Sequence, residues 1–310
     1  MPFLSAIYPL LCALALFTAG PGEKPVYGVK EVRDVVYGVA EGYWTEAPDN
    51  VWSSSGLVFR RSDSRRPLEL KMDVYLPDGD DPGGERPLLL MMHGGAFFMG
   101  HKTEKAHVEW CRYFASLGYV AVSLNYRLGF CLDKPDITRA EEDAVEDAGN
   151  ALHYLLGREE FRIDPQQVYL AGTSAGAFTA LALAYGPGRQ EGPYRIRAVA
   201  NLWGYVHGLD ILENARIPIL SFQSEEDPVV PYREGFPLGA KLLTEKAFGT
   251  LAVYERAKEL GIPCEHHPCP EKRHRLQTDD KGELTPRFYE IRDCMAAFFA
   301  ACSPSGERSK

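Results

Sequence analysis

From about residue 68 onward, apolar and polar positions follow patterns that predict strands alternating with helices. In residues 68–76 (LELKMDVYL) they alternate one by one, which is typical of a strand with one exposed face. The runs at 87–92 (PLLLMM) and 119–124 (YVAVSL) are continuously apolar, which indicates strands buried on both faces. Shorter apolar segments predict the remaining strands, the last of them at an edge of the sheet: 168–171, 196–203, 217–223 and 265–270.

The segments between these strands carry the spacing of helices. In residues 138–156, for example, Ala144, Ala148, Ala151 and Leu155 recur every three or four positions. Alternation of strands and helices implies a mostly parallel central sheet with helices on both faces, so we expect an α/β fold. The other predicted helices are 104–117, 174–185, 250–260 and 288–300.

The chain has 310 residues, a length that suits one large α/β domain. We place this domain at residues 67–302 and expect a flexible tail at 303–310. Residues 23–66 form an N-terminal extension in which we find no readable pattern. No repeat or low-complexity tract divides the chain.

The first 22 residues differ from the rest because they contain no charged side chain, and residues 10–17 are an unbroken apolar run. A membrane-spanning helix needs about 20 apolar residues, so this run is too short to be one. With the small residues Ala19, Gly20 and Gly22 after it, the run is typical of a secretory signal peptide, although no basic residue precedes it. We expect export, secreted or periplasmic, without stable membrane insertion once the signal is removed. The alternative is a buried N-terminal segment of the fold.

Composition narrows the range of partners. Hydrophobic residues make up 45% of the chain and charged residues 25%, which are ordinary globular values. The formal net charge of −9 offers no basic surface for nucleic acid or anionic lipid. We therefore expect neither nucleic acid nor anionic lipid as a partner.

Removal of the signal peptide would leave an even number of cysteines, which permits disulfides in an exported chain but leaves their pairing open. His266, His267 and Cys269 lie close together, yet no second cluster of ligands completes a metal site. We predict neither a metal nor a cofactor. The six cysteines are Cys111, Cys131, Cys264, Cys269, Cys294 and Cys302.

The clearest chemical signal lies directly after the strand at 168–171. Residues 172–176 read GTSAG and match the G-x-S-x-G pattern, with an Ala-rich helix following. A nucleophile elbow has this context, in which a tight turn between strand and helix exposes a serine hydroxyl. The alternative is an ordinary turn with a helix-capping serine. The context favours Ser174 as a nucleophile.

A serine nucleophile needs donors for the oxyanion that develops during attack. Residues 93–96 read HGGA and follow a buried strand, where an oxyanion loop of the HGGG type belongs. We expect backbone amides of Gly95 or Ala96 to act together with the amide of Ala175. His93 is then a structural residue of the loop and not the catalytic base.

The acid and the base should follow the serine in chain order. Three acids, Glu225, Glu226 and Asp227, come after the strand at 217–223. We favour Asp227 because the following proline fixes its turn. After the last strand, His274 is the expected base. His266 and His267 lie within that strand and are expected to face neighbouring elements.

From about residue 68 to 300 the chain resembles the α/β-hydrolase serine esterases, with a small or absent lid. It is similar to exported bacterial carboxylesterases and carbohydrate (acetyl or feruloyl) esterases related to the hormone-sensitive-lipase branch. Two departures are Ala96 in place of glycine and basic residues at 272, 273 and 275 around His274; these could lower the pKa of the histidine or attract acidic substrates. The matching segments are HGGAF at 93–97, NYRL at 125–128, GTSAG at 172–176, DPVVP at 227–231 and GIP at 261–263.

The resemblance implies a hydrolase that cleaves small-molecule or polysaccharide-linked carboxylic esters through an acyl-enzyme, with Ser174, His274 and Asp227 as nucleophile, base and acid. Only a short segment separates the strand ending at Trp203 from the next one, so we expect an open site suited to short or polymer-linked acyl groups. The alternatives are a serine exopeptidase on the same fold and a non-catalytic binding module that retains the hydrolase shell.

Overall fold

The computed structural model describes residues 26–46, 52–53, 56–57, 65–79, 83–129, 137–186, 193–241 and 244–304. The signal-peptide prediction at 1–22, Cys131 and most of the predicted tail lie outside these residues. An eight-stranded sheet runs through the described part, with strand order β1-β4-β6-β5-β7-β8-β9-β12. Its strands are β1 (Gly28–Gly42), β4 (Arg66–Asp78), β5 (Arg86–Met92), β6 (Val120–Leu124), β7 (Ile163–Thr173), β8 (Ile196–Leu202), β9 (Ile219–Ser224) and β12 (Cys264–Cys269).

The sheet is mostly parallel, as the sequence predicts. Strands β6, β5, β7, β8, β9 and β12 pair in parallel, and only β1 with β4 and β4 with β6 are antiparallel. The strand at 264–269 lies at the edge of the sheet, which confirms its predicted place. Short two-residue pairs lie outside this sheet: β2 (Trp52–Ser53) with β3 (Gly56–Leu57), and β10 (Glu234–Gly235) with β11 (Ala247–Phe248).

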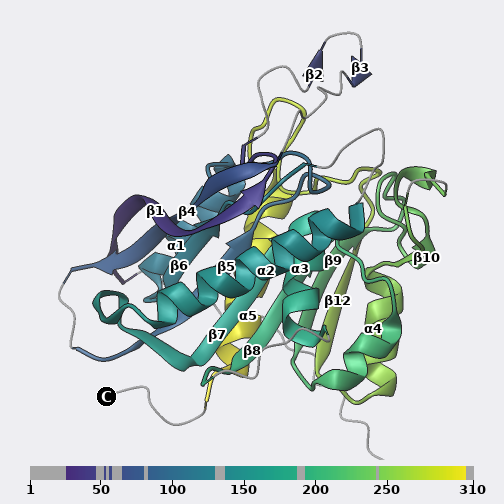
Figure 1. The fold of residues 1–310 in the computed structure, drawn as a ribbon. Helices are drawn as coiled ribbons and strands as arrows, with labels where there is room; N and C mark the ends of the chain where they lie inside the picture. The colour runs from purple at the N-terminus through teal and green to yellow at the C-terminus, as the bar shows by residue number, and fades with distance from the viewer. Residues whose placement is uncertain are drawn as a thin grey trace, which may run out of the picture.

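Helices cover both faces of the sheet (Figure 1). One apolar core lies between the sheet and α2, α3 and α4, and a second lies between the sheet and α1 and α5. Strand β5 shows why its sequence is continuously apolar: Leu88, Leu90 and Met92 enter the first core, while Leu89 and Met91 enter the second. The helices are α1 (Lys105–Ser116), α2 (Ile137–Leu156), α3 (Ala175–Tyr185), α4 (Thr250–Glu259) and α5 (Pro286–Cys302).

The N-terminal extension supplies β1, which the sequence analysis left unread. It pairs with β4 over nearly its whole length, but the register shifts between Val32 and Val35 and again between Val36 and Gly38. Asp34, inside the first irregularity, has a positive φ of 55°. These irregularities break the two-residue period by which a strand is recognised in a sequence.

The carboxyl ends of the parallel strands meet at one edge of the sheet, and the loops after them build the candidate site. No large lid is inserted between β8 and β9, where the described chain holds one short 3-10 helix, Leu209–Asn214. Val206 in this connection forms a backbone bridge with Phe248 of β11, a strand that follows β9 in the chain. Within the described part of the chain, no helix is both long and apolar enough to cross a membrane.

Candidate active site

Ser174 occupies the sharp turn between β7 and α3. Its backbone has φ 52° and ψ −118°, a conformation that non-glycine residues rarely adopt. The turn needs glycine on both sides: a Cβ on Gly172 would lie 2.2 Å from Gly176 C, and one on Gly176 would lie 2.2 Å from Met92 O. The predicted strand–turn–helix context is therefore present, and it holds Ser174 partly exposed above the helix.

His274 joins the serine to the predicted acid. Its Nε2 lies 2.8 Å from Ser174 Oγ, and its Nδ1 lies 2.8 Å from Asp227 Oδ2 and 3.0 Å from Oδ1. The His274 side chain is 14% exposed and that of Asp227 is fully buried. The structure thus brings together three residues that the sequence separates by up to 100 positions.

The Asp227 carboxylate is fixed by its own turn. Oδ1 accepts hydrogen bonds from the backbone amides of Val229 (2.8 Å) and Val230 (3.1 Å). Oδ2 accepts one from Gln223 Nε2 at 3.2 Å, and the same amide nitrogen donates to Val230 O at 2.9 Å. Gln223 is a buried residue of β9 that sequence reasoning missed, and no sequence signal marks it.

The two competing acids take no part in this arrangement. Glu225 and Glu226 are exposed, and Glu226 pairs with Lys272 at 2.9 Å. The second basic neighbour of the histidine, Arg273, pairs with Asp280 at 2.9 Å. Arg275 is exposed. Two of the three basic residues around His274 are thus matched by acids.

The predicted oxyanion loop folds tightly after β5. Gly95 has φ 119°, and its carbonyl accepts hydrogen bonds from the amides of Phe98 and Met99. A Cβ on Gly95 would lie 2.0 Å from Met99 O, so no other residue fits. Ala96 has a left-handed φ of 53°. A residue with a Cβ is strained in this conformation, so the backbone of Ala96 is strained where glycine would not be.

The loop lies against the serine turn. A Cβ on Gly94 would come 3.2 Å from Ser174 Cβ and 3.0 Å from Thr173 O. Ala175 is the first residue of α3, and an amide at this position has no partner within its helix. Gly95, Ala96 and Ala175 thus belong to two segments that touch beside the serine hydroxyl.

His93 holds the loop, as the sequence analysis expects. It is buried, and its Nδ1 donates to Gly94 O at 2.7 Å. Its ring stacks on Tyr126 at 4.4 Å, and the Tyr126 hydroxyl donates to His93 O. Burial lowers the pKa of His93 to about 4, so the ring is neutral at physiological pH.

The segment that follows β1 contacts the same loop and helps to hold it. Trp44 exchanges backbone hydrogen bonds with Leu128, and its indole Nε1 donates to Phe98 O at 3.0 Å. The two rings meet edge to face at 5.0 Å. Glu46 pairs with His101 at 2.7 Å. The N-terminal extension is therefore part of the scaffold of the site.

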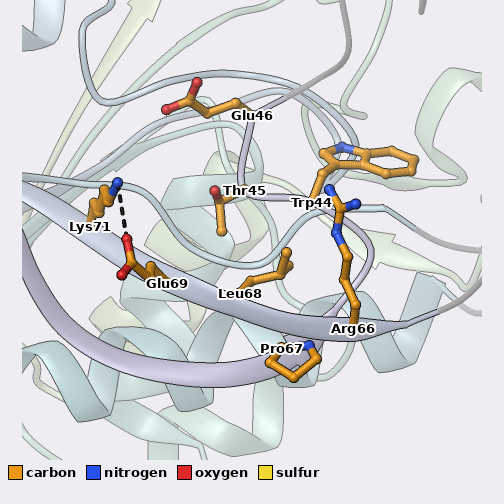
Figure 2. Close-up of a pocket in the computed structure, with 8 residues that line it drawn as sticks. All are labelled: Trp44, Thr45, Glu46, Arg66, Pro67, Leu68, Glu69 and Lys71. Carbon is orange, nitrogen blue, oxygen red and sulfur yellow. Dashed lines mark ion pairs between the residues drawn. The ribbon is translucent and has the colours of Figure 1, made fainter.

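A pocket of about 460 Å³ opens beside this segment (Figure 2). It contains none of the three residues joined through His274. Acids, bases, a hydroxyl and an indole share its lining, and Lys71 pairs with Glu69 on the same strand at 3.2 Å (Figure 2). The lining residues are Trp44, Thr45, Glu46, Arg66, Pro67, Leu68, Glu69 and Lys71.

A small apolar cluster adjoins the turn that holds Asp227. Phe178, one helical turn after Ser174, packs with Tyr205, Val229 and Val230 in a small cluster of its own. The Tyr205 hydroxyl donates to the buried carboxylate of Glu141 at 2.8 Å. This cluster supplies apolar side chains close in the chain to both Ser174 and Asp227.

The other predicted histidines face neighbouring elements, which confirms that expectation. His266 Nε2 lies 3.1 Å from Thr250 Oγ1, and the ring stacks on Tyr254. His267 stacks on Phe222 at 4.3 Å. No group of three or more His, Cys, Asp or Glu in the described residues could hold a metal ion. The described cysteines are all free: Cys111, Cys264, Cys269, Cys294 and Cys302.

Comparison with solved structures identifies the fold. The thermophilic esterase 2 of the planctomycete Thermogutta terrifontis, solved with propionate bound, matches with a TM-score of 0.59 at 19% identity, covering 91% of this chain and 97% of that one. The α/β hydrolase MGS-M1, from a deep-sea metagenome of the Medee basin, matches with a TM-score of 0.54 at 19% identity over 75% and 92%. The fold is that of the α/β hydrolases.

Sequence comparisons point to the same group. The family model named BD-FAE matches residues 72–201. Probable carboxylesterase 2 of Arabidopsis thaliana is 27% identical over 212 residues, 62% of this chain and 65% of that protein. The non-reducing polyketide synthase ausA of Emericella nidulans is 34% identical over 145 residues, 45% of this chain. The chain spans only 6% of that synthase's length.

Proposed function

We propose that this chain is a serine hydrolase that cleaves carboxylic esters through an acyl-enzyme. One observation carries the proposal: His274 lies 2.8 Å from both Ser174 Oγ and Asp227 Oδ2, beside a strained serine turn. The esterases among the similar proteins support it. The fold alone would not, because one fold can serve many functions.

In the first step, Ser174 Oγ attacks the ester carbonyl and forms a C–O bond while His274 Nε2 takes the hydroxyl proton. The carbonyl π electrons move to oxygen and give a tetrahedral oxyanion. Asp227 accepts a hydrogen bond from His274 Nδ1–H and stabilises the positive charge of the imidazolium. When the oxyanion collapses, the bond to the alcohol oxygen breaks, and His274 returns its proton to that oxygen.

The second step repeats this chemistry with water. His274 takes a proton from a water molecule, whose oxygen attacks the acyl carbon. The bond to Ser174 Oγ then breaks, the serine regains its proton, and the free acid leaves. In both steps the amides of Ala175 and of Gly95 or Ala96 are the proposed donors to the oxyanion. Neither a metal nor a cofactor is required.

A short acyl group fits the surroundings of the serine. The cluster of Phe178, Tyr205 and Val229 forms a wall one helical turn away, and no large lid adds apolar surface between β8 and β9. The Thermogutta terrifontis esterase 2 was solved with propionate and with butyrate, both of which are short acids. Short-chain acyl esters are therefore the proposed substrates.

A polar, uncharged alcohol group suits the neighbouring pocket. Its lining offers two acidic and two basic side chains, a hydroxyl and an indole, so that donors and acceptors are balanced. A few placed polar groups of this kind orient a ligand in a pocket. We propose a carbohydrate-linked ester as the natural substrate, and we propose export on the basis of the apolar residues 1–22.

Labelling by a fluorophosphonate probe tests the proposal. The wild-type protein should be labelled at Ser174, and Ser174→Ala should be neither labelled nor active while it unfolds at the same temperature. Acetyl, butyryl and feruloyl esters should be hydrolysed in preference to peptide substrates. A protein that stays unlabelled is a binding module, and one that cleaves peptides fastest is an exopeptidase; either result refutes the proposal.

A further inference from the structure

A second histidine–carboxylate pair lies behind the serine turn, outside the triad. His107, on the first turn of α1, is completely buried. Its Nε2 lies 3.2 Å from Thr173 Oγ1, and its Nδ1 lies 3.4 Å from Glu104 Oε2. The ring also meets Trp110 edge to face. The proposed mechanism uses neither Glu104 nor His107.

The hydroxyl that His107 contacts lies at the junction of the two halves of the site. Thr173 directly precedes Ser174 and is buried. A Cβ on Gly94 of the oxyanion loop would come 3.2 Å from both Thr173 Oγ1 and Ser174 Cβ. A shift of the Thr173 side chain would therefore move the serine turn relative to the loop.

The negative charge of Glu104 favours a stable contact with His107. Burial would raise the pKa of Glu104, but the contact with His107 and the nearby His93 and Arg275 lower it to about 2. Glu104 is then a carboxylate at any pH at which an esterase of this kind works. The same charge acts on His93 of the oxyanion loop and works against the effect of its burial. The Glu104 carboxylate thus contacts the histidine at the serine turn and acts electrostatically on the histidine of the loop.

We propose that Glu104 and His107 are positioning residues that hold the Thr173 hydroxyl and, through it, the strained turn of Ser174 against the oxyanion loop. The inference rests on the proposed function, since it concerns the placement of the proposed nucleophile. A reacting group misplaced by about 1 Å can cost on the order of 10²-fold in rate. Thr173 and His107 are buried away from the surface to which an ester would bind, so we expect ester binding to change little.

The mildest test removes only the hydroxyl contact. Thr173→Val keeps the shape and β-branching of the side chain, whereas Thr173→Ser keeps the hydroxyl. We expect Thr173→Val to lower kcat roughly 10- to 100-fold with KM nearly unchanged, and Thr173→Ser to stay within a few-fold of wild type. If both variants lose kcat equally, or if neither does, the hydroxyl has no positioning role and the proposal is wrong.

His107→Leu and Glu104→Gln extend the test to the pair itself. Each should lower kcat by a factor similar to that of Thr173→Val, and combining His107→Leu with Thr173→Val should add little because both remove one contact. His267→Leu is the matched control: it changes a half-buried histidine that also pairs with a glutamate, Glu265 at 3.3 Å, but on the edge strand β12. It should lower the melting temperature without lowering kcat. Assays are made below the melting temperature of every variant.

The rate of fluorophosphonate labelling separates the two proposals. If the wild type is not labelled at Ser174, the proposed function fails and the positioning role fails with it. If the wild type is labelled and the His107→Leu and Thr173→Val variants are labelled at the same rate, the serine is the nucleophile but the pair does not position it. Slower labelling of these variants, with normal labelling of His267→Leu, supports the inference.

Discussion

Asp227 and His274 are 47 positions apart in the chain, yet Asp227 Oδ2 lies 2.8 Å from His274 Nδ1. The carboxylate is fully buried, and both of its oxygens accept further hydrogen bonds from neighbouring groups. A carboxylate held in this way can fix which nitrogen of the imidazole carries the proton. The neighbouring glutamates, exposed on the same turn, cannot.

This contrast gives the first prediction. Asp227→Asn should lower kcat on the order of 10⁴-fold, because an amide nitrogen in place of Oδ2 would favour the wrong tautomer of His274. Glu225→Gln and Glu226→Gln should each leave kcat within a few-fold. Steady-state kinetics on a short ester compares the three isosteric amides. Full activity in Asp227→Asn, with a large loss at either glutamate, would overturn the assignment.

His274→Ala should be nearly as damaging as Ser174→Ala, since members of one catalytic unit do not act additively. His266→Ala and His267→Ala should keep kcat within a few-fold because their rings pack against Tyr254 and Phe222. The measurement is kcat for the four alanine variants. If either control variant lost nearly all of its kcat while His274→Ala kept most of it, His274 would be ruled out as the base.

Two glycines allow backbone strain to be separated from steric overlap. Gly95 and Gly84 have φ of 119° and 120°, but a Cβ on Gly95 would overlap Met99 O, while nothing lies within 4 Å of one on Gly84. Gly84→Ala should cost about 1–3 kcal/mol of unfolding free energy and leave kcat intact. Gly95→Ala should cost more and also lower kcat. Urea unfolding and kinetics of the pair test this; equal effects would mean that the loop tolerates displacement.

Stability at mildly acidic pH should depend on His266. Burial lowers its pKa to about 4 from the ordinary 6.5. The unfolded chain therefore takes up a proton first, and folding stability falls as pH decreases from about 6.5 to about 4, then levels off. His266→Gln should flatten this part of the profile, although His93 continues to contribute. Urea unfolding between pH 7 and 4 measures it, and parallel curves for the two proteins would contradict it.

The pocket lined by Trp44, Glu69 and Lys71 should matter only for large substrates. Glu69→Ala and Lys71→Ala should raise KM for an acetylated oligosaccharide several-fold, because they remove polar groups that would contact its sugar units. KM for a small aryl acetate should not change. Parallel kinetics on the two substrates decides the matter: an equal change on both would assign these residues to stability and not to recognition.

Much of the fold follows from local patterns. The continuous apolar runs at β5 and β6 predict strands buried on both faces, and the structure places alternate residues of β5 in two different cores. The serine turn could also be predicted, because its glycines and the flanking strand and helix form a local signal. In contrast, β1 has two register shifts that remove the alternating pattern.

The supporting residues of the site could not be predicted in the same way. Gln223 reaches Asp227 because the turn after β9 folds back toward the strand, and His107 reaches Thr173 only when α1 packs on the sheet. Neither residue lies in a motif or has an unusual neighbour in the sequence. Their contacts depend on the packing of whole elements, which a local pattern does not encode.

The fixed turn of Asp227 also bears on how substrate binding energy is used. Because the acid, histidine and serine already lie within hydrogen-bonding distance of one another, no binding energy has to be spent on assembling them. An ester with the smallest alcohol should then reach nearly the same kcat as an elaborate one, and larger substrates should gain through KM. Selectivity among esters would then arise from differences in affinity and local concentration. The rate of the chemical steps would depend little on the alcohol to which the acyl group is attached.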